Sequence, residues 1–213
     1  MLTIGLTGPS GAGKGTASAA WRELGAFVLD CDAMYHEMLR VDRALRSDLC
    51  AAFPEAADGE GGVDRRRLAG IVFADRERLR TLNTLAFTHI TRRINEILDE
   101  QRAAGTSCVI LDAPTLFEAG ADRLCDAIVA VTAPEEIRAA RIAQRDGIPM
   151  EAVYARFRNQ HSDEFFREKC DFVLENTGSV DKLHADAVEL WKKLVEAVHS
   201  RDGEGASPYF ANH

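Results

Sequence analysis

The most constraining feature of this chain is a glycine-rich segment that directly follows a short apolar run near its N-terminus. Residues 4–16 read IGLTGPSGAGKGT, in which Gly8, four further residues, Gly13 and Lys14 have the spacing of a phosphate-binding loop. The glycines let successive backbone N–H groups turn toward one anion, and the lysine adds a positive charge for the outer phosphates. Such a loop needs a strand before it and a helix after it. The motif therefore predicts an α/β protein that binds a nucleoside triphosphate.

The end of this loop departs from the usual pattern. Gly15 occupies the position where serine or threonine is expected, and the hydroxyl comes one residue later, at Thr16. The helix predicted over 16–24 would direct its positive N-terminal dipole at the same phosphates. Glycine-rich turns occur in many proteins, but so many constrained positions between an apolar strand and a helix favour phosphate binding. The predicted nucleotide-binding residues are Gly11, Ala12, Gly13, Lys14, Gly15 and Thr16.

Apolar runs and helical patterns alternate along most of the chain. Near-continuous apolar segments predict strands that are covered on both faces, as in a parallel sheet. The predicted strands are 2–7, 26–30, 108–112, 127–132 and 172–174, and the predicted helices are 16–24, 135–145, 150–160 and 180–199. This order predicts an α/β three-layer sandwich with a mainly five-stranded parallel sheet and right-handed crossovers.

The gap between the second and third predicted strands is too long for one crossover helix. We interpret residues 33–105 as a mostly helical insertion that binds the second substrate, because leucine and isoleucine recur there at helical spacing. The core is then 1–32 and 106–199, with a helix–turn–helix lid at about 138–162. Residues 200–213 are polar and contain glycine, which predicts a flexible tail.

Composition excludes several classes of protein. The chain has 213 residues and a net charge of −8, whereas a general nucleic-acid binder is usually basic. No apolar run reaches the ~18 residues of a membrane span, and no signal peptide is evident at the N-terminus. Five cysteines without a paired spacing favour reduced thiols. We therefore expect a cytoplasmic protein that acts on small molecules and binds neither nucleic acid nor membrane.

Arginines gather locally despite the acidic balance. Arg138, Arg141 and Arg145 have the spacing of one helical face, which favours a phosphate-binding surface because they follow an apolar strand. The alternative is a solvated face on which these arginines pair with Glu135 and Glu136 one turn earlier.

Carboxylates follow two predicted strands at the edge where open α/β sheets bind ligands. Asp30 and Asp32 alternate along the end of the second strand, so both can reach one side of that edge. A carboxylate there can accept the proton of a hydroxyl that attacks the γ-phosphorus. The alternative is that Asp32 caps a helix over 33–40. Asp112 ends the third strand, where a carboxylate can hold water on Mg²⁺.

An ordered series of motifs resembles the dephospho-coenzyme A kinase family over about residues 1–195. The series begins with IGLTG before the loop and VLDCD after the first helix. It continues with Asp64-Arg65-x2-Leu68-x3-Val72-Phe73, LDAP-x-LFE over 111–118, Arg141-x3-Arg145-Asp146, Gln160 and CDFVLEN over 170–176. The series as a whole is much more specific than the phosphate-binding loop alone.

The resemblance implies a kinase that uses ATP and Mg²⁺ to phosphorylate the ribose 3′-hydroxyl of dephospho-coenzyme A, and that is a monomer. It implies catalytic roles for Asp32 as general base and for Lys14 and Arg141 on the phosphates. The remaining implied roles are ATP binding by Arg145 and Asn176, acceptor binding by Asp32, Arg65, Asp112 and Pro114, and Mg²⁺ binding by Thr16 and Asp112, directly or through water.

Two alternatives remain at this stage. The loop resembles that of cytidylate kinases, so a nucleoside monophosphate kinase is the second hypothesis, although such an acceptor needs no evident general base. The third is a non-catalytic nucleotide-binding relative, because His36, Phe87 and Phe166 stand where the family usually has other residues.

Overall fold

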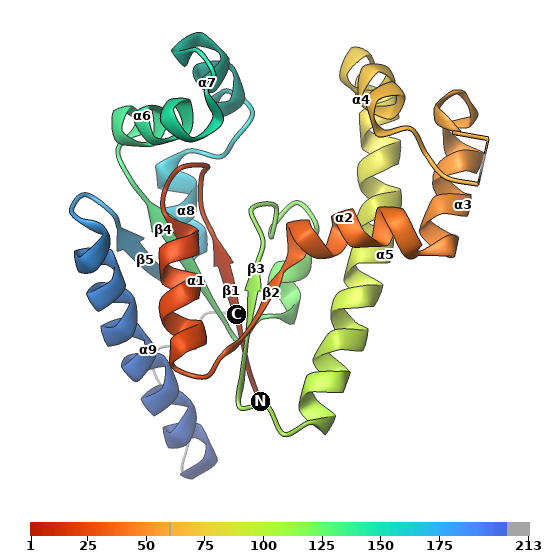
Figure 1. The fold of residues 1–213 in the computed structure, drawn as a ribbon. Coiled ribbons are helices and arrows are strands. Elements are labelled where there is room, and N and C mark those ends of the chain that lie inside the picture. Colours follow the sequence, from red (N-terminus) through yellow and green to blue (C-terminus); the bar gives the residue numbers. More distant parts are fainter. Residues whose placement is uncertain (60, 204–213) are drawn as a thin grey trace.

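A computed structural model describes residues 1–59 and 61–203, the side chains of the last seven excepted. One parallel sheet of five strands has the order β2-β3-β1-β4-β5 and lies at the centre of the molecule (Figure 1). The strands are β1 (Leu2–Thr7), β2 (Phe27–Asp30), β3 (Cys108–Asp112), β4 (Ala127–Thr132) and β5 (Phe172–Glu175). The α/β three-layer fold predicted from the sequence is confirmed.

Helices cover both faces of the sheet, which explains why its central strands are apolar throughout. Every residue of β1 and β4 is buried. Helices α1 (Lys14–Glu23) and α9 (Val180–Gly203) pack on one face, where Trp21 and Leu194 are fully buried. On the other face, the C-terminal half of α5 (Arg76–Ala103) packs through Ile94, Ile97 and Leu98.

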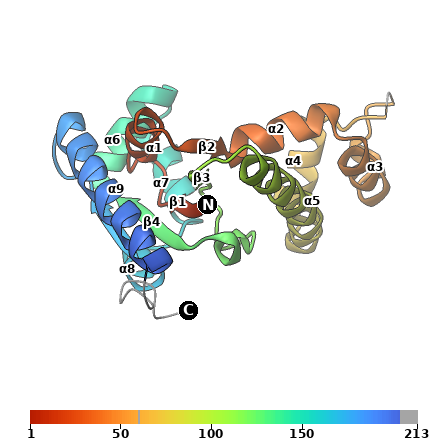
Figure 2. The same cartoon turned by 90° about the horizontal axis from the view of Figure 1, so that it is seen from below.

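The segment between β2 and β3 forms a helical arm beside the sheet (Figure 2). It consists of α2 (Cys31–Val41), α3 (Arg43–Ala52), the 3₁₀ helix η1 (Pro54–Ala56), α4 (Arg65–Ala74) and α5. The arm has its own hydrophobic cluster, whose members all come from residues 34–85. Helix α5 is 28 residues long, or about 42 Å at 1.5 Å per residue, so it serves both this cluster and the sheet.

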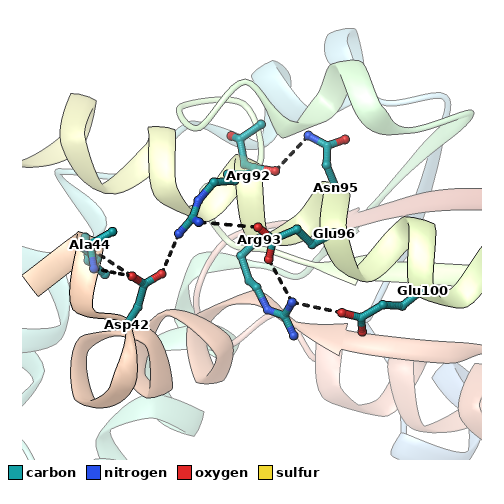
Figure 3. A network of polar contacts seen from close by, with 9 residues as sticks. Asp42, Ala44, Arg92, Arg93, Asn95, Glu96 and Glu100 are labelled. Carbon is teal, nitrogen blue, oxygen red and sulfur yellow. Dashed lines mark hydrogen bonds and ion pairs between the residues drawn. The ribbon is translucent and has the colours of Figure 1, made fainter.

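A network of charged side chains fastens the corner between α2 and α3 to α5 (Figure 3). Asp42 caps α3 by accepting hydrogen bonds from the backbone of Ala44 at 2.9 Å and Leu45 at 3.1 Å, and it also accepts one from Arg92 on α5 at 2.7 Å. Further along α3, Asp48 contacts the buried His89 at 2.8 Å. Two polar links from α3 to α5 therefore accompany the apolar packing of the arm.

The segment after β4 folds into α6 (Glu135–Asp146), α7 (Met150–Phe157) and α8 (Asp163–Lys169). We refer to α6 and α7 as the lid helices; Ile142 and Val153 are buried between them. The prediction of a helix over 150–160 is wrong at its end, and α8 was not predicted. Ser162 caps α8 by accepting a hydrogen bond from the Phe165 N–H, a cap that makes a new helix possible so soon after α7.

The C-terminal helix is longer than predicted. Helix α9 continues to Gly203, so the first residues of the tail predicted over 200–213 belong to this helix, and residues 204–213 lie outside the described part. Among the described residues, no helix combines the length and the apolar character needed to cross a membrane.

Candidate phosphoryl-transfer site

A cavity of 490 Å³ lies at the carboxyl ends of β2 and β3, where residues of the glycine-rich loop, of α2 and of α6 also line it. Most of the residues that the sequence singled out lie around it. The lining residues are Ser10, Gly11, Gly13, Lys14, Gly15, Asp30, Asp32, Asp112, Pro114, Arg141, Ile142 and Arg145. Of the predicted site residues, Ala12, Thr16, Arg65 and Asn176 do not line it.

The phosphate loop, residues 8–16, needs glycine for steric reasons at two of its positions, 8 and 13. Gly8 has φ of +130°, and a Cβ there would lie 2.2 Å from the carbonyl oxygen of Val131. Gly13 has φ of +111°, and a Cβ there would lie 2.5 Å from the side-chain nitrogen of Asn176. Other residues are strained at such φ angles and also collide here. The loop therefore packs tightly against β4 and against the segment after β5.

Lys14 begins α1 and extends its ammonium group back over the loop. Its Nζ donates a hydrogen bond to the carbonyl oxygen of Gly8 at 3.1 Å. Burial lowers the pKa of Lys14, Asp112 and Asp32 act in the opposite direction, and Arg145 adds to the lowering. Lys14 thus lies among carboxylates and close to a second cation, Arg145.

The two aspartates at the junction of β2 and α2 are arranged differently from the prediction. Asp30 is the last residue of β2, but Asp32 lies in the first turn of α2 and does not alternate with it along a strand. Asp30, not Asp32, caps this helix: its Oδ1 accepts a hydrogen bond from the Ala33 N–H at 2.8 Å. Both carboxylates nevertheless line the cavity, because the helix begins immediately at the sheet edge.

With Asp30 as the cap, the carboxylate of Asp32 is left for the cavity. Its side chain is exposed to solvent there, yet desolvation by the surrounding walls raises its pKa. The charge of Asp30 raises that pKa further, while Lys14 and His36 lower it. A carboxylate with a raised pKa is a stronger base than an ordinary aspartate, which suits proton transfer.

Asp112 ends β3 directly opposite Asp30 in the pairing of β2 with β3. Burial raises its pKa, and the positive charge of Lys14 opposes this effect most strongly. Its carboxylate is an oxygen ligand of the kind that Mg²⁺ prefers, whereas Thr16, the other predicted Mg²⁺ ligand, does not line the cavity. The described residues include no group of three or more His, Cys, Asp or Glu that could hold a metal. Mg²⁺ commonly uses only one or two carboxylates with water and phosphates, so a site with Asp112 as a carboxylate ligand fits it.

The arginines of α6 have three different environments. Arg141 donates hydrogen bonds to the carbonyl oxygens of Gly11 at 3.3 Å and Ala12 at 3.5 Å, and to Oδ1 of Asn176 at 3.3 Å. Asn176 is buried and donates to the carbonyl oxygen of Ala12 at 2.7 Å. Arg141 and Asn176 thus lie together against the phosphate loop, although they come from α6 and from the segment after β5.

Arg138 belongs to neither of the two predicted arrangements. It is 6% exposed, donates to the carbonyl oxygen of Ala133 at 2.8 Å, and has its guanidinium 4.5 Å from the centre of the Phe157 ring. The prediction that it belongs to a phosphate-binding face with Arg141 and Arg145 is therefore wrong, and so is a solvated face. Helical spacing alone did not reveal that α7 and α8 cover this side of α6.

Arg145 lies at the cavity but is paired with its neighbour in the sequence. Its Nε contacts Asp146 at 2.7 Å, and Asp146 also contacts Arg156 of α7 at 2.7 Å. These two arginines lower the pKa of Asp146 to about 2. The cluster joins the two lid helices at the mouth of the cavity.

Arg65 does not line this cavity, although it belongs to the arm, which contributes Asp32 to the lining. It begins α4, and its Nη2 lies 3.2 Å from Nε2 of His36 on α2. A second, mainly apolar cavity of 170 Å³ lies between α2 and α5 and shares Asp32 with the first. Phe87 and Tyr35 line this second cavity, as does Cys31, whose thiol pKa is raised to about 12 by burial.

Three residues at the site are not among the site residues predicted from the sequence. Ser10 and Ile142 line the cavity, and Gln160 bonds to Ser10 from 150 positions away. Ser10 lies inside the predicted loop and could have been included. The role of Gln160 has no local signal in the sequence, because it depends on how the segment after α7 returns to the sheet.

Comparison with known proteins finds relatives that match most of the chain. The family model described as dephospho-CoA kinase matches residues 2–182. The dephospho-CoA kinase of Corynebacterium diphtheriae is 35% identical over 93% of this chain and 100% of its own length. The crystal structure of TT1252 from Thermus thermophilus has a TM-score of 0.77 and 36% identity, covering 91% of this chain and 97% of that one. Dephospho-CoA kinase from Campylobacter jejuni, at 24% identity, has the same fold, with a TM-score of 0.69 over 92% of this chain and 98% of its own.

Proposed function

The chain belongs to the dephospho-CoA kinase family, and we propose that it transfers the γ-phosphoryl group of ATP to the ribose 3′-hydroxyl of dephospho-coenzyme A. The products are coenzyme A and ADP, so the reaction is the last step of coenzyme A synthesis. The observation that carries this proposal is that Lys14, Arg141 and Asp32 all line the same cavity. Cations for the donor phosphates and a base for the acceptor hydroxyl are thereby combined in one site.

In the proposed reaction, the acceptor oxygen forms a bond to the γ-phosphorus while the bond from this phosphorus to the β,γ-bridging oxygen breaks. Asp32 accepts the hydroxyl proton, and ADP leaves with the electron pair of the broken bond. Lys14 and Arg141 stabilise the negative charge on the transferring group. Mg²⁺, bound through Asp112 and Thr16 directly or through water, would neutralise phosphate charge.

We assign the ATP subsite to the phosphate loop (Gly11, Ala12, Gly13, Lys14, Gly15, Thr16), Arg145 and Asn176. Backbone N–H groups at the start of α1 suit the phosphates, since a helix N-terminus attracts anions. Asn176 supports the loop through Ala12 and contacts Arg141, and the family resemblance places the segment after β5 on the adenine side of ATP. ATP use follows from family membership, whereas these residue roles are proposals.

We assign the acceptor to the opposite side, where the arm meets the sheet. Asp32, Asp112 and Pro114 line the main cavity there, and the apolar cavity between α2 and α5 continues from Asp32. Arg65 lies beyond His36, at the start of α4. An acceptor with a nucleotide at one end and an uncharged chain at the other fits this change from charged to apolar lining.

We also propose a location and an oligomeric state for the protein. A cytoplasmic monomer that acts on small molecules accords with five free cysteines and a net charge of −8. The charge also argues against nucleic acid as a partner.

The test is an assay of the purified protein with Mg²⁺ and ATP and one of four acceptors: dephospho-coenzyme A, CMP, AMP or none. We expect rapid ADP formation only with dephospho-coenzyme A, together with a product heavier by one phosphoryl group. Faster turnover of CMP would replace this proposal with a nucleoside monophosphate kinase. ATP binding without transfer to any acceptor would indicate a non-catalytic relative.

A further inference from the structure

Gln160 makes a two-point contact with the phosphate loop that none of the roles above requires. The Ser10 N–H donates to Oε1 of Gln160 at 3.1 Å, and Nε2 of Gln160 donates to the Ser10 hydroxyl oxygen at 2.7 Å. One carboxamide thus bonds both the backbone N–H and the hydroxyl of one loop residue. A two-point contact fixes orientation as well as distance, which a single hydrogen bond does not.

Gln160 itself is placed by the segment that leads from α7 to α8. Its backbone N–H donates to the carbonyl oxygen of Phe157, the last residue of α7. The next residue, His161, stacks on Phe165 with ring centres 3.7 Å apart and contacts Glu118 at 3.2 Å. The side chain of Gln160 therefore starts from a fixed point at the base of the lid helices.

The contact occurs where the phosphate loop is also held from α6. Arg141 donates to the carbonyl oxygens of Gly11 and Ala12, and a Cβ on Gly11 would lie 2.8 Å from the carbonyl oxygen of Arg138. Gln160 extends this support to Ser10 and uses the Ser10 N–H, which is then unavailable to a phosphate. The remaining loop N–H groups keep a defined orientation before ATP arrives.

We propose that Gln160 is a positioning residue for ATP: its carboxamide fixes Ser10 and so couples the base of the lid helices to the phosphate loop. This inference rests on the proposed function only for ATP as the ligand. A loop that is ordered in advance binds phosphates without first losing conformational entropy. Loss of the contact should therefore weaken ATP binding more than it slows the chemical step.

The test measures ATP affinity directly, by calorimetry without acceptor, in Gln160→Met, which keeps the size of the side chain and removes both hydrogen bonds. We expect Kd for ATP to rise about tenfold, the loss of two hydrogen bonds of modest net value. In turnover assays, KM for ATP should rise by a similar factor, with a smaller change of kcat and none of KM for the acceptor. Gln101→Met is the matched control, because Gln101 pairs with Thr106 at the far end of α5 and should leave ATP affinity unchanged.

Ser10→Ala supplies a milder variant if Gln160→Met fails to fold, since it removes only the hydroxyl and keeps the Ser10 N–H bond. We expect a smaller loss of ATP affinity, and no added loss from Ser10→Ala in the Gln160→Met background. Full additivity of the two losses would overturn the proposal, and so would unchanged ATP affinity in folded Gln160→Met. A protein that binds ATP normally but phosphorylates none of the acceptors would instead count against the proposed function alone.

Discussion

Two walls meet at the cavity, and they are built by different means. The phosphate wall is a short backbone loop in which Gly8 and Gly13 adopt φ angles of +130° and +111°. The wall proposed to bind the acceptor, here the acceptor wall, is made of side chains from α2 and α5, among them Tyr35 and, more than 50 residues later in the sequence, Phe87 and Ile90. One wall depends on local backbone geometry and the other on the packing of distant helices.

The two walls therefore differ in the substitutions that each can tolerate. In the phosphate wall, a single added Cβ meets backbone or buried atoms at 2.2–2.5 Å. In the acceptor wall, Tyr35 packs on the cluster of the arm over residues 34–85, whereas Ile90 packs on the cluster that α5 shares with the sheet. Substitutions confined to the cluster of the arm can therefore alter this wall without changing residues of the phosphate loop. The comparison teaches that ATP binding and acceptor binding should respond separately to substitutions, with Asp32 at the border between them.

The largest effect is expected for Asp32→Asn at that border. Removing the base should lower kcat by roughly 10²–10⁴-fold, the usual contribution of a positioned acid–base group. ATP affinity should not fall, and the melting temperature should change little, because Asp30 caps α2. Steady-state kinetics, calorimetry and thermal melting measure the three quantities. Glu37→Gln, an exposed carboxylate of the same helix, is the control, and near-normal turnover in Asp32→Asn would remove Asp32 from the mechanism.

The next effect is expected in the phosphate wall. Lys14→Ala should lower kcat/KM for ATP by about 10²–10³-fold, since a preorganised charge on the transferring group is lost. The fold should persist, because within the described part of the chain the side chain of Lys14 donates one hydrogen bond, to the carbonyl oxygen of Gly8. KM for the acceptor should change much less. Turnover is compared with that of Lys182→Ala, an exposed lysine of α9; equal activities would mean that Lys14 does not contact the phosphates.

A smaller and more selective effect is expected from the arm. Leu49 is fully buried in the cluster of the arm, and Leu49→Ala should lower the free energy of unfolding by about 2–5 kcal/mol. In the molecules that remain folded, KM for the acceptor should rise while ATP affinity stays near normal. Leu194→Ala, at an equally buried position of α9, should destabilise without this selectivity. Equal losses of ATP and acceptor binding in Leu49→Ala would show that the two walls are not independent.

The phosphate wall could be predicted at the level of residues because its information is local. The loop, the strands before and after it, and Asp112 at a strand end follow from glycine spacing and apolar runs. The acceptor wall could be predicted only as a helical segment, since the neighbours of Phe87 depend on how α2 crosses α5. The position of Arg65 outside the main cavity could not be predicted either, because it depends on how α4 lies against α2.

Two errors have local causes. The alternation of Asp30 and Asp32 predicts that both follow the direction of the strand, but the cap at Asp30 begins α2 immediately after β2. Arg138 was grouped with Arg141 and Arg145 because helical spacing gives the face of a residue but not what packs on that face. Ser10 and Gln160 are 150 positions apart, so no local sequence pattern indicates that they are in contact.

The smallest effect is expected from Asp30→Asn and concerns pH. The charge of Asp30 contributes to the raised pKa of Asp32, after burial, which is the main cause. Asparagine caps a helix about as well as aspartate, so the bond from the Ala33 N–H to residue 30 should persist while the charge is removed. The pKa of Asp32 then falls, and the base stays ionised at lower pH.

The pH profile of kcat/KM, which reports ionisations of the free enzyme, measures this change. Activity is lost on acidification when Asp32 becomes protonated, so the acidic limb of Asp30→Asn should lie at lower pH than that of the wild type. Ionisation of ATP affects both profiles equally and cancels in the comparison. Asp75→Asn changes a cap of the same kind at the start of α5, away from the cavity, and its limb should coincide with that of the wild type. A limb that does not move in Asp30→Asn would mean that the titrating group is not the neighbour of Asp30, and the base would have to be sought elsewhere in the cavity.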